Sequence, residues 1–172
     1  MEFNEVITTR YSVRKFQTRP LGREMVLRVL EAARAAPTAV NRQPWRILAI
    51  AGEREMEKLA QCTRYTFGAL AALIVGFLPE KAWVRSYDGH NAGIVDASIV
   101  ATSLMLAIHN LGLGTCWVGS FDPQKLLELF EPGFEPAAIL PIGWPDEHST
   151  PSAKHFERLP LHETVTWKGE WE

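Results

Sequence analysis

Hydrophobic and polar positions repeat along the chain with two different periods. Residues 21–36 carry apolar side chains at helical spacing with charged residues between them, and Pro37 ends this pattern. Short continuous apolar runs, as at 45–51, are typical of buried strands. The patterns predict helices at 21–36, 53–61, 94–111 and 122–130, and strands at 45–51, 72–77, 115–118 and 137–142.

The predicted helix 94–111 is apolar on nearly every face, and its length approaches the roughly 20 residues that a membrane span needs. Asp96, His109 and Asn110 favour instead the central helix of a soluble core or a subunit interface. We expect Asp96 to meet a buried backbone group or an interface partner. Gly112 suits the left-handed position that follows many helices.

Helices and strands mix without a strict βαβ rhythm, which predicts an α+β fold with helices around a small sheet. The 172 residues contain no linker or internal repeat, so we expect one domain over 1–172. Residues 144–151 form a predicted loop before a tail that carries Trp167 and Trp171. We expect this tail to pack against something.

Composition excludes several kinds of partner. The net charge is -2 with 22% charged residues, so no polyanion such as nucleic acid is expected, and any phosphate contact depends on local placement. Cys62 and Cys116 stand alone, and His148 and His155 lack a metal-site spacing, so neither a disulfide nor a metal site is predicted. The acidic start lacks a basic region and apolar run, which favours a cytoplasmic location.

Two segments carry candidate chemistry. If residues 10–16 are extended, Arg10, Ser12 and Arg14 lie on one face, where two guanidinium groups and a hydroxyl suit a phosphoester. The alternative for this segment is a solvated basic strand edge. In the loop 37–45, the amides of Asn41 and Gln43 suit the edge of a heterocycle, and small residues admit a flat ring. The alternative here is an ordinary loop between prolines.

Taken together with later segments, these motifs resemble the nitroreductase family of flavin mononucleotide (FMN) enzymes. The resemblance rests on Arg10-x-Ser12-x-Arg14-x-Phe16, Ala36-Pro37-Thr38-Ala39-x-Asn41-x-Gln43-Pro44-Trp45, the run from Leu111 to Asp122, Ile139-Leu140-Pro141-Ile142-Gly143-Trp144-Pro145, and Glu157-Arg158-Leu159-Pro160. These matches keep their order and span nearly the whole chain. A dinucleotide fingerprint at Gly112-x-Gly114 is rejected, because a strand rather than a helix is predicted to follow.

The resemblance implies a small, central, mostly antiparallel sheet surrounded by helices, in an obligate homodimer whose C-terminal arm reaches the partner. It implies that Arg10 and Arg158 bind the FMN phosphate, that Ser12 holds the ribityl chain or the polar ring edge, and that Arg14 lies near N1 and O2. Near N5 it places Gly119 and Ser120. It assigns Pro37, Thr38, Ala39 and Asn41 to the partner subunit's site. The remaining cofactor-binding positions that it implies are Tyr11, Gln43, Trp117 and Gly143.

The implied activity is electron transfer from NAD(P)H through bound FMN to a flat acceptor such as a nitroaromatic or quinone, in a ping-pong reaction. The chemistry belongs to the flavin and needs no catalytic acid or base from the protein. Two alternatives stay open: a flavin reductase or reductive dehalogenase of the same superfamily, or a non-catalytic flavin-binding homodimer. The chain departs from the family pattern at Phe156, where a second basic residue is frequent, and residues 63–88 match no part of it.

Overall fold

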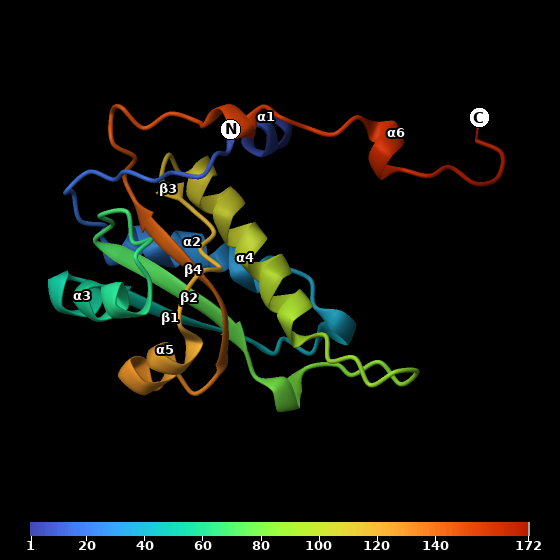
Figure 1. The fold of residues 1–172 in the computed structure, drawn as a ribbon, viewed down its shortest axis with the longest axis horizontal. Coiled ribbons are helices and arrows are strands. Elements are labelled where there is room, and N and C mark those ends of the chain that lie inside the picture. Colours follow the sequence, from blue (N-terminus) through green and yellow to red (C-terminus); the bar gives the residue numbers. More distant parts are fainter. Residues whose placement is uncertain (172) are drawn as a thin grey trace.

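A four-stranded antiparallel sheet lies at the centre of the computed structural model, which describes residues 1–171 (Figure 1). Its strands, in the spatial order β1-β2-β4-β3, are β1 (Trp45–Ala51), β2 (Ala71–Phe77), β4 (Glu135–Gly143) and β3 (Gly114–Thr115). Strand β2 pairs on both sides and is buried throughout, as its continuous apolar sequence requires. The predicted α+β class with a small antiparallel sheet is confirmed.

Helices cover both faces of the sheet. They are α1 (Phe3–Thr9), α2 (Arg23–Ala35), α3 (Glu53–Cys62), α4 (Gly93–Asn110), α5 (Pro123–Phe130) and α6 (Leu161–Thr164), with short 3-10 turns at Ala39–Asn41, Pro79–Lys81 and Ala153–His155. Because side chains alternate across a strand, Leu73 and Val75 of β2 pack with α2 and α4, while Ala72 and Ile74 pack with α3 and α5 on the other face.

Helix α4 is the core helix that its polar residues predicted. Its length and composition also meet the criteria for a membrane span, but Val100, Ala101, Leu104 and Ile108 are fully buried in the cluster that also holds residues of α2 and the sheet (Figure 1). Gly112 follows its last turn with φ of 74°, which confirms the predicted left-handed position.

The structure differs from the sequence prediction at the strand 115–118 and at the helices α1 and α6, which were not predicted. The predicted strand at 115–118 is wrong, because β3 ends at Thr115 and only Val118 pairs again, with Ile139 at N···O distances of 2.9 and 3.0 Å. Cys116 and Val118 are buried on the core as a loop, and an apolar run does not distinguish that from a strand. Helix α1 was not predicted, because its apolar stripe is short. Val6 is its one buried residue.

The C-terminal arm, residues 150–171, leaves the body and runs past α1 to α6 and beyond (Figure 1). From residue 156 to 171 every residue is exposed. The large apolar side chains among them are Phe156, Leu159, Leu161, Val165, Trp167 and Trp171. Within the described residues, the tail therefore finds little to pack against in its own protomer.

Gly93 begins α4 where the helix meets the ring of Phe77, and a Cβ atom at this position would overlap that ring. We expect Gly93→Ala to lower the free energy of unfolding by about 1–3 kcal/mol, because the helix must shift on a packed core. Urea unfolding measures this. The control is Gly22→Ala, whose Cβ meets nothing within 4 Å; an equal loss in both variants would contradict the packing argument.

Candidate functional site

The N-terminal arginine segment, residues 10–16, is extended against the end of the sheet. Ser12 bridges Thr115 in parallel, and the N–H of Val13 donates to the carbonyl oxygen of Thr115 at 2.9 Å. Val13 and Phe16 are buried, whereas Arg10 and Ser12 are half-buried and Arg14 is exposed. This alternation places Arg10, Ser12 and Arg14 on the outer face, as the sequence predicted.

Two glycines of the sheet allow this segment to lie so close. A Cβ atom on Gly114 would come within 2.7 Å of the Val13 side chain, and one on Gly143 within 3.0 Å of the Phe16 ring. Gly143 is buried and pairs with Gly114 across β3 and β4. The requirement for glycine at 143 thus follows from packing, and its predicted cofactor contact stays a prediction.

A cavity of about 270 Å³ opens beside Arg14. Arg14, Trp117, Gly119 and Ser120, four of the sequence-predicted site residues, lie in its wall. The same wall includes Tyr65, Phe67, Cys116 and Val118. Tyr65 and Phe67 belong to the stretch that sequence reasoning left unassigned; the signal that could have found them is a pair of aromatics directly after a helix, followed by Gly68.

Thr63 links the wall of the cavity that carries Tyr65 to the wall that carries Ser120. The Thr63 side chain is buried, and its Oγ1 donates to the carbonyl oxygen of Ser120 at 2.7 Å while it accepts from the N–H of Tyr65 at 3.2 Å. The N–H of Asp122 donates to the carbonyl oxygen of Cys62 at 2.8 Å. Within residues 1–171 the N–H groups of Gly119 and Ser120 donate to no protein acceptor, so both are available to a ligand.

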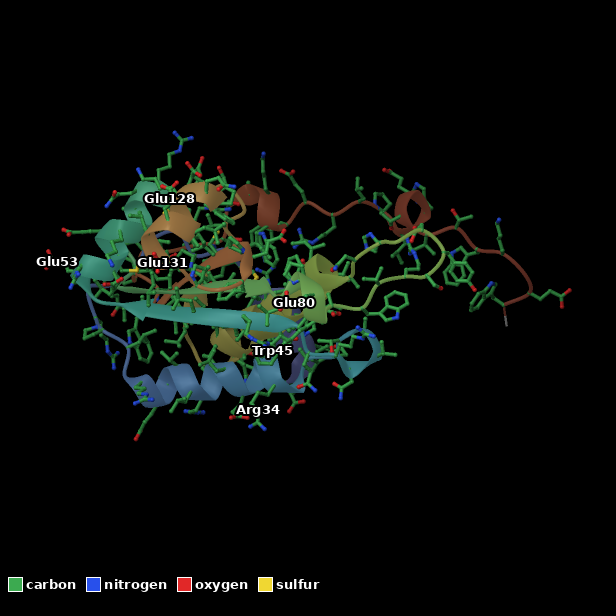
Figure 2. The ribbon with its side chains drawn as sticks, turned by 90° about the horizontal axis from the view of Figure 1, so that it is seen from below. Arg34, Trp45, Glu53, Glu80, Glu128 and Glu131 are labelled. Carbon is green, nitrogen blue, oxygen red and sulfur yellow. The ribbon has the colours of Figure 1, made fainter. Side chains whose placement is uncertain are left out.

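The positive charge on this side has no internal partner. In the part of the chain that the structure describes, neither Arg10 nor Arg14 forms an ion pair or a side-chain hydrogen bond. A much larger cavity of about 1000 Å³ lies beside α5, but Glu80, Glu131 and Glu135 line it (Figure 2 labels the first two). An anion is therefore expected at the smaller cavity, because carboxylates repel it at the larger one.

Burial and the charge of Arg10 both affect the pKa of His109, near the end of α4. Its Nε2 lies 2.8 Å from Oγ1 of Thr9, whose hydroxyl proton is directed to the carbonyl oxygen of Glu5 at 2.6 Å. Nε2 is therefore the donor in the contact with Thr9. Burial, and then the charge of Arg10, hold the pKa of His109 below its usual range, while Glu5 acts in the opposite direction.

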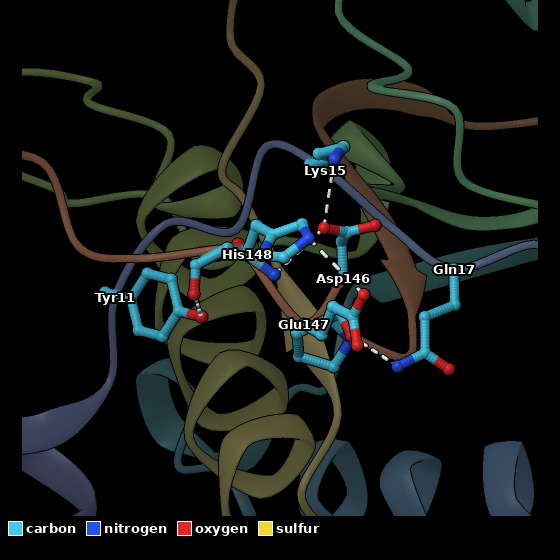
Figure 3. A network of polar contacts seen from close by, with 8 residues as sticks. Tyr11, Lys15, Gln17, Asp146, Glu147 and His148 are labelled. Atoms are coloured by element: carbon cyan, nitrogen blue, oxygen red, sulfur yellow. Dashed lines mark hydrogen bonds and ion pairs between the residues drawn. The ribbon is translucent and has the colours of Figure 1, made fainter.

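The start of the C-terminal arm lies along the arginine segment. Figure 3 shows Lys15 paired with Asp146 at 3.0 Å, and Tyr11 and Gln17 donating to the carbonyl oxygens of Ser149 and Pro145 at 2.9 and 2.8 Å. The N–H of His148 and the ammonium of Lys15 both donate to Asp146 and hold the pKa of its carboxyl below the usual range. Tyr11 thus faces the arm and the core, on the opposite side from Arg14.

One protomer brings together only part of the predicted site. Arg158 is exposed on the arm, where its guanidinium donates to the neighbouring carbonyl oxygen of Glu157 at 2.7 Å. Pro37, Thr38, Ala39, Asn41 and Gln43 do not line the cavity beside Arg14. They form a separate loop, in which the N–H of Ala39 donates to Asp96 in the first turn of α4. In residues 1–171 no three His, Cys, Asp or Glu side chains gather as a metal site would require.

The structure is that of an α+β protein in which unpaired arginines lie beside a small cavity with aromatic walls. Comparison with known proteins identifies the class further. A sequence model described as the nitroreductase family matches residues 7–67 and 61–144. The chain belongs to the nitroreductase family and is an oxidoreductase.

Individual relatives agree with this assignment. The crystal structure of a nitroreductase family protein from Clostridium difficile 630 is 34% identical and superposes with a TM-score of 0.90, over 99% of this chain and 100% of that one. A nitroreductase from Desulfovibrio desulfuricans, crystallised in complex with FMN, is 26% identical with a TM-score of 0.78, over 97% and 96% of the two chains. A Methanothermobacter thermautotrophicus protein that carries the name NADH dehydrogenase/NAD(P)H nitroreductase is 28% identical, over 86% of this chain and 80% of its own length.

The lowered pKa of His109 predicts how stability depends on pH. Below its ordinary pKa of about 6.5 the unfolded chain binds a proton at this ring more readily than the folded protein does, so the free energy of unfolding falls as pH decreases through that value. We expect His109→Gln, which keeps a donor for Thr9, to remove this part of the pH dependence. Urea unfolding between about pH 8 and pH 5 tests it; identical profiles for the two proteins would contradict it.

Proposed function

We propose that the protein is an FMN-dependent oxidoreductase that transfers electrons from NAD(P)H to a flat acceptor such as a nitroaromatic or a quinone, in a ping-pong reaction. The observation that carries the proposal is the row of unpaired donors at Arg10, Ser12 and Arg14, which continues into a cavity with aromatic walls. The FMN-bound relative supports the choice of flavin. The NAD(P)H nitroreductase relative supports the choice of electron donor.

The residues present fit FMN. A phosphate group matches the unpaired guanidinium of Arg10 and the hydroxyl of Ser12. The flat ring matches the side chains of Tyr65, Phe67 and Trp117, which offer faces and edges for stacking. The free N–H groups of Gly119 and Ser120 supply donors for the ring's polar atoms.

When bound, the flavin supplies the redox chemistry: it accepts hydride from NAD(P)H and gives two electrons to the acceptor. The protein's own groups bind and orient. Arg10, with Arg158 from the arm, holds the phosphate, and Ser12 positions the chain between phosphate and ring. Arg14 places a fixed positive charge at the ring edge, where negative charge develops on reduction. Thr63 keeps the walls of the cavity in register, which preserves the slot for a flat acceptor.

We further propose that two copies of the chain form a homodimer with shared sites, each copy being one domain over residues 1–172. The loop of residues 37–43 would enter the partner subunit's site, and the C-terminal arm would cover the partner. The exposed apolar residues of the arm, and Phe3, Ile7, Ile94 and Val95 on α1 and α4, support a second copy as their cover. We place the dimer in the cytoplasm, consistent with the core position of α4.

The direct test is to mix the purified protein with FMN and add NAD(P)H without oxygen. We expect a yellow protein whose flavin absorbance bleaches and returns when a quinone or nitroaromatic is added. A protein that binds no FMN would overturn the proposal. A yellow protein that NAD(P)H does not bleach would support the non-catalytic alternative, and turnover only with free flavin or a halogenated acceptor would support the alternatives within the superfamily.

Arg10→Ala should weaken FMN binding about 10- to 150-fold, because a hydrogen bond to a charged phosphate contributes roughly 1.5–3 kcal/mol. Quenching of flavin fluorescence measures the Kd. Riboflavin lacks the phosphate, so it should bind equally to the variant and the parent. Arg54→Ala, on the exposed side of α3, serves as the control for lost charge. Equal FMN affinity in Arg10→Ala and the parent would refute the role of Arg10.

Arg14→Ala should lower the reduction potential of bound FMN more than it weakens binding, because the charge that favours the reduced ring is removed. Potentiometric titration of the loaded protein measures the shift, with Arg54→Ala again as the control. An unchanged potential would show that Arg14 does not lie beside the ring.

A further inference from the structure

The loop of residues 37–43 has a strained backbone. Val40, Asn41 and Gln43 have φ of 46°, 53° and 50°. These values lie in the left-handed region, which residues other than glycine rarely adopt. Valine is especially unsuited to this region because its side chain branches at Cβ. Such strain persists only where surrounding contacts fix the backbone, and it clusters at functional sites.

Few groups hold this backbone in place. The N–H of Ala39 donates to Oδ1 of Asp96 at 2.9 Å, and the N–H of Gln43 donates to Oγ1 of Thr38 at 3.1 Å. The guanidinium of Arg42 reaches the carbonyl oxygen of Ala82 at 3.3 Å. Of these, only the first contact ties the loop to a helix of the core.

Asp96 is an unusual residue to find in this place. It lies in the first turn of α4 and is 1% exposed, yet its Oδ2 has no partner among the described residues. Burying a carboxylate with only one oxygen in use costs free energy. Such a residue therefore indicates that the one contact it makes is needed. The start of a helix offsets part of that cost, because its dipole favours negative charge.

We propose that Asp96 is a positioning residue that keeps loop 37–43 in the strained shape in which it reaches the partner subunit's flavin. The inference rests on the proposed function. In its own protomer no residue of the loop lines the cavity beside Arg14, and the loop is fixed instead at the first turn of α4. Under this proposal, Asp96 acts on the partner subunit's site rather than on the cavity of its own protomer.

Three variants at position 96 separate the possible roles. Asp96→Leu removes the acceptor and keeps the branching and the number of heavy atoms, whereas Asp96→Asn keeps an oxygen for Ala39 and loses only the charge. We expect Asp96→Leu to raise the Kd for FMN about tenfold or more, with the dimer mass unchanged, and Asp96→Asn to restore binding close to that of the parent. If Asp96→Leu fails to fold, Asp96→Ser replaces it, since its hydroxyl is one bond shorter.

Hydrogen exchange at the Ala39 amide reports on the loop independently of flavin. The amide should be protected in the parent and in Asp96→Asn, and should exchange freely in Asp96→Leu. If the parent binds no FMN, the proposed function fails, and with it the flavin role of the loop, whatever the exchange shows. If FMN binding depends on Arg10 but not on Asp96, only the present inference is overturned. Equal losses in the Leu and Asn variants would also overturn it, because they would assign the effect to charge.

A mixed dimer decides whether the loop acts across subunits. One chain carries Arg10→Ala and the other Asp96→Leu, with different affinity tags so that only the heterodimer is isolated. If the loop serves the partner's site, one site has both defects and the other has none, so half of the sites bind FMN with the parent's affinity. If the loop serves its own protomer, both sites are defective and no such site is found, which would overturn the inference.

Discussion

The packing of α4 onto the sheet positions both loop 37–43 and the strand against which the arginine segment lies. Its buried face joins the strands to α2, its first turn holds loop 37–43 through Asp96, and its last turn leads through Gly112 to the strand against which the arginine segment lies. Because α4 is continuous and buried along one face, these parts cannot move independently. A change at Gly93, where α4 meets Phe77, therefore acts on the same first turn that carries Asp96.

Local signals in the sequence predict most of this fold. Asp122 followed by Pro123 marks the start of α5, and its carboxylate accepts from the N–H of Lys125 at 3.1 Å, the contact that such a capping residue makes. The strands β1, β2 and β4 lie at the apolar runs, with ends shifted by at most a few residues. The run at 115–118 misled, because Thr115, Cys116 and Val118 are buried as in a core strand while the backbone leaves the sheet after Thr115.

Less of the site than of the fold could be predicted from the sequence, because tertiary contacts bring its residues together. Alternation along residues 10–14 could be predicted, since it depends only on an extended backbone. The aromatic wall could not, because Tyr65 reaches the cavity through Thr63, whose hydrogen bond to Ser120 joins residues 57 positions apart. The strain at Val40 leaves no sequence signature either, since valine ordinarily avoids that backbone conformation.

The C-terminal arm has a consequence for handling the protein. Lys154, Arg158 and Lys168 lie on a stretch that its own protomer leaves exposed, next to large apolar side chains. Exposed segments of this kind are where proteases cut first. Trypsin would cleave off the apolar tail, while the Lys15–Asp146 pair holds the start of the arm against the body. The rate of cleavage in the arm therefore measures how well another molecule shields it.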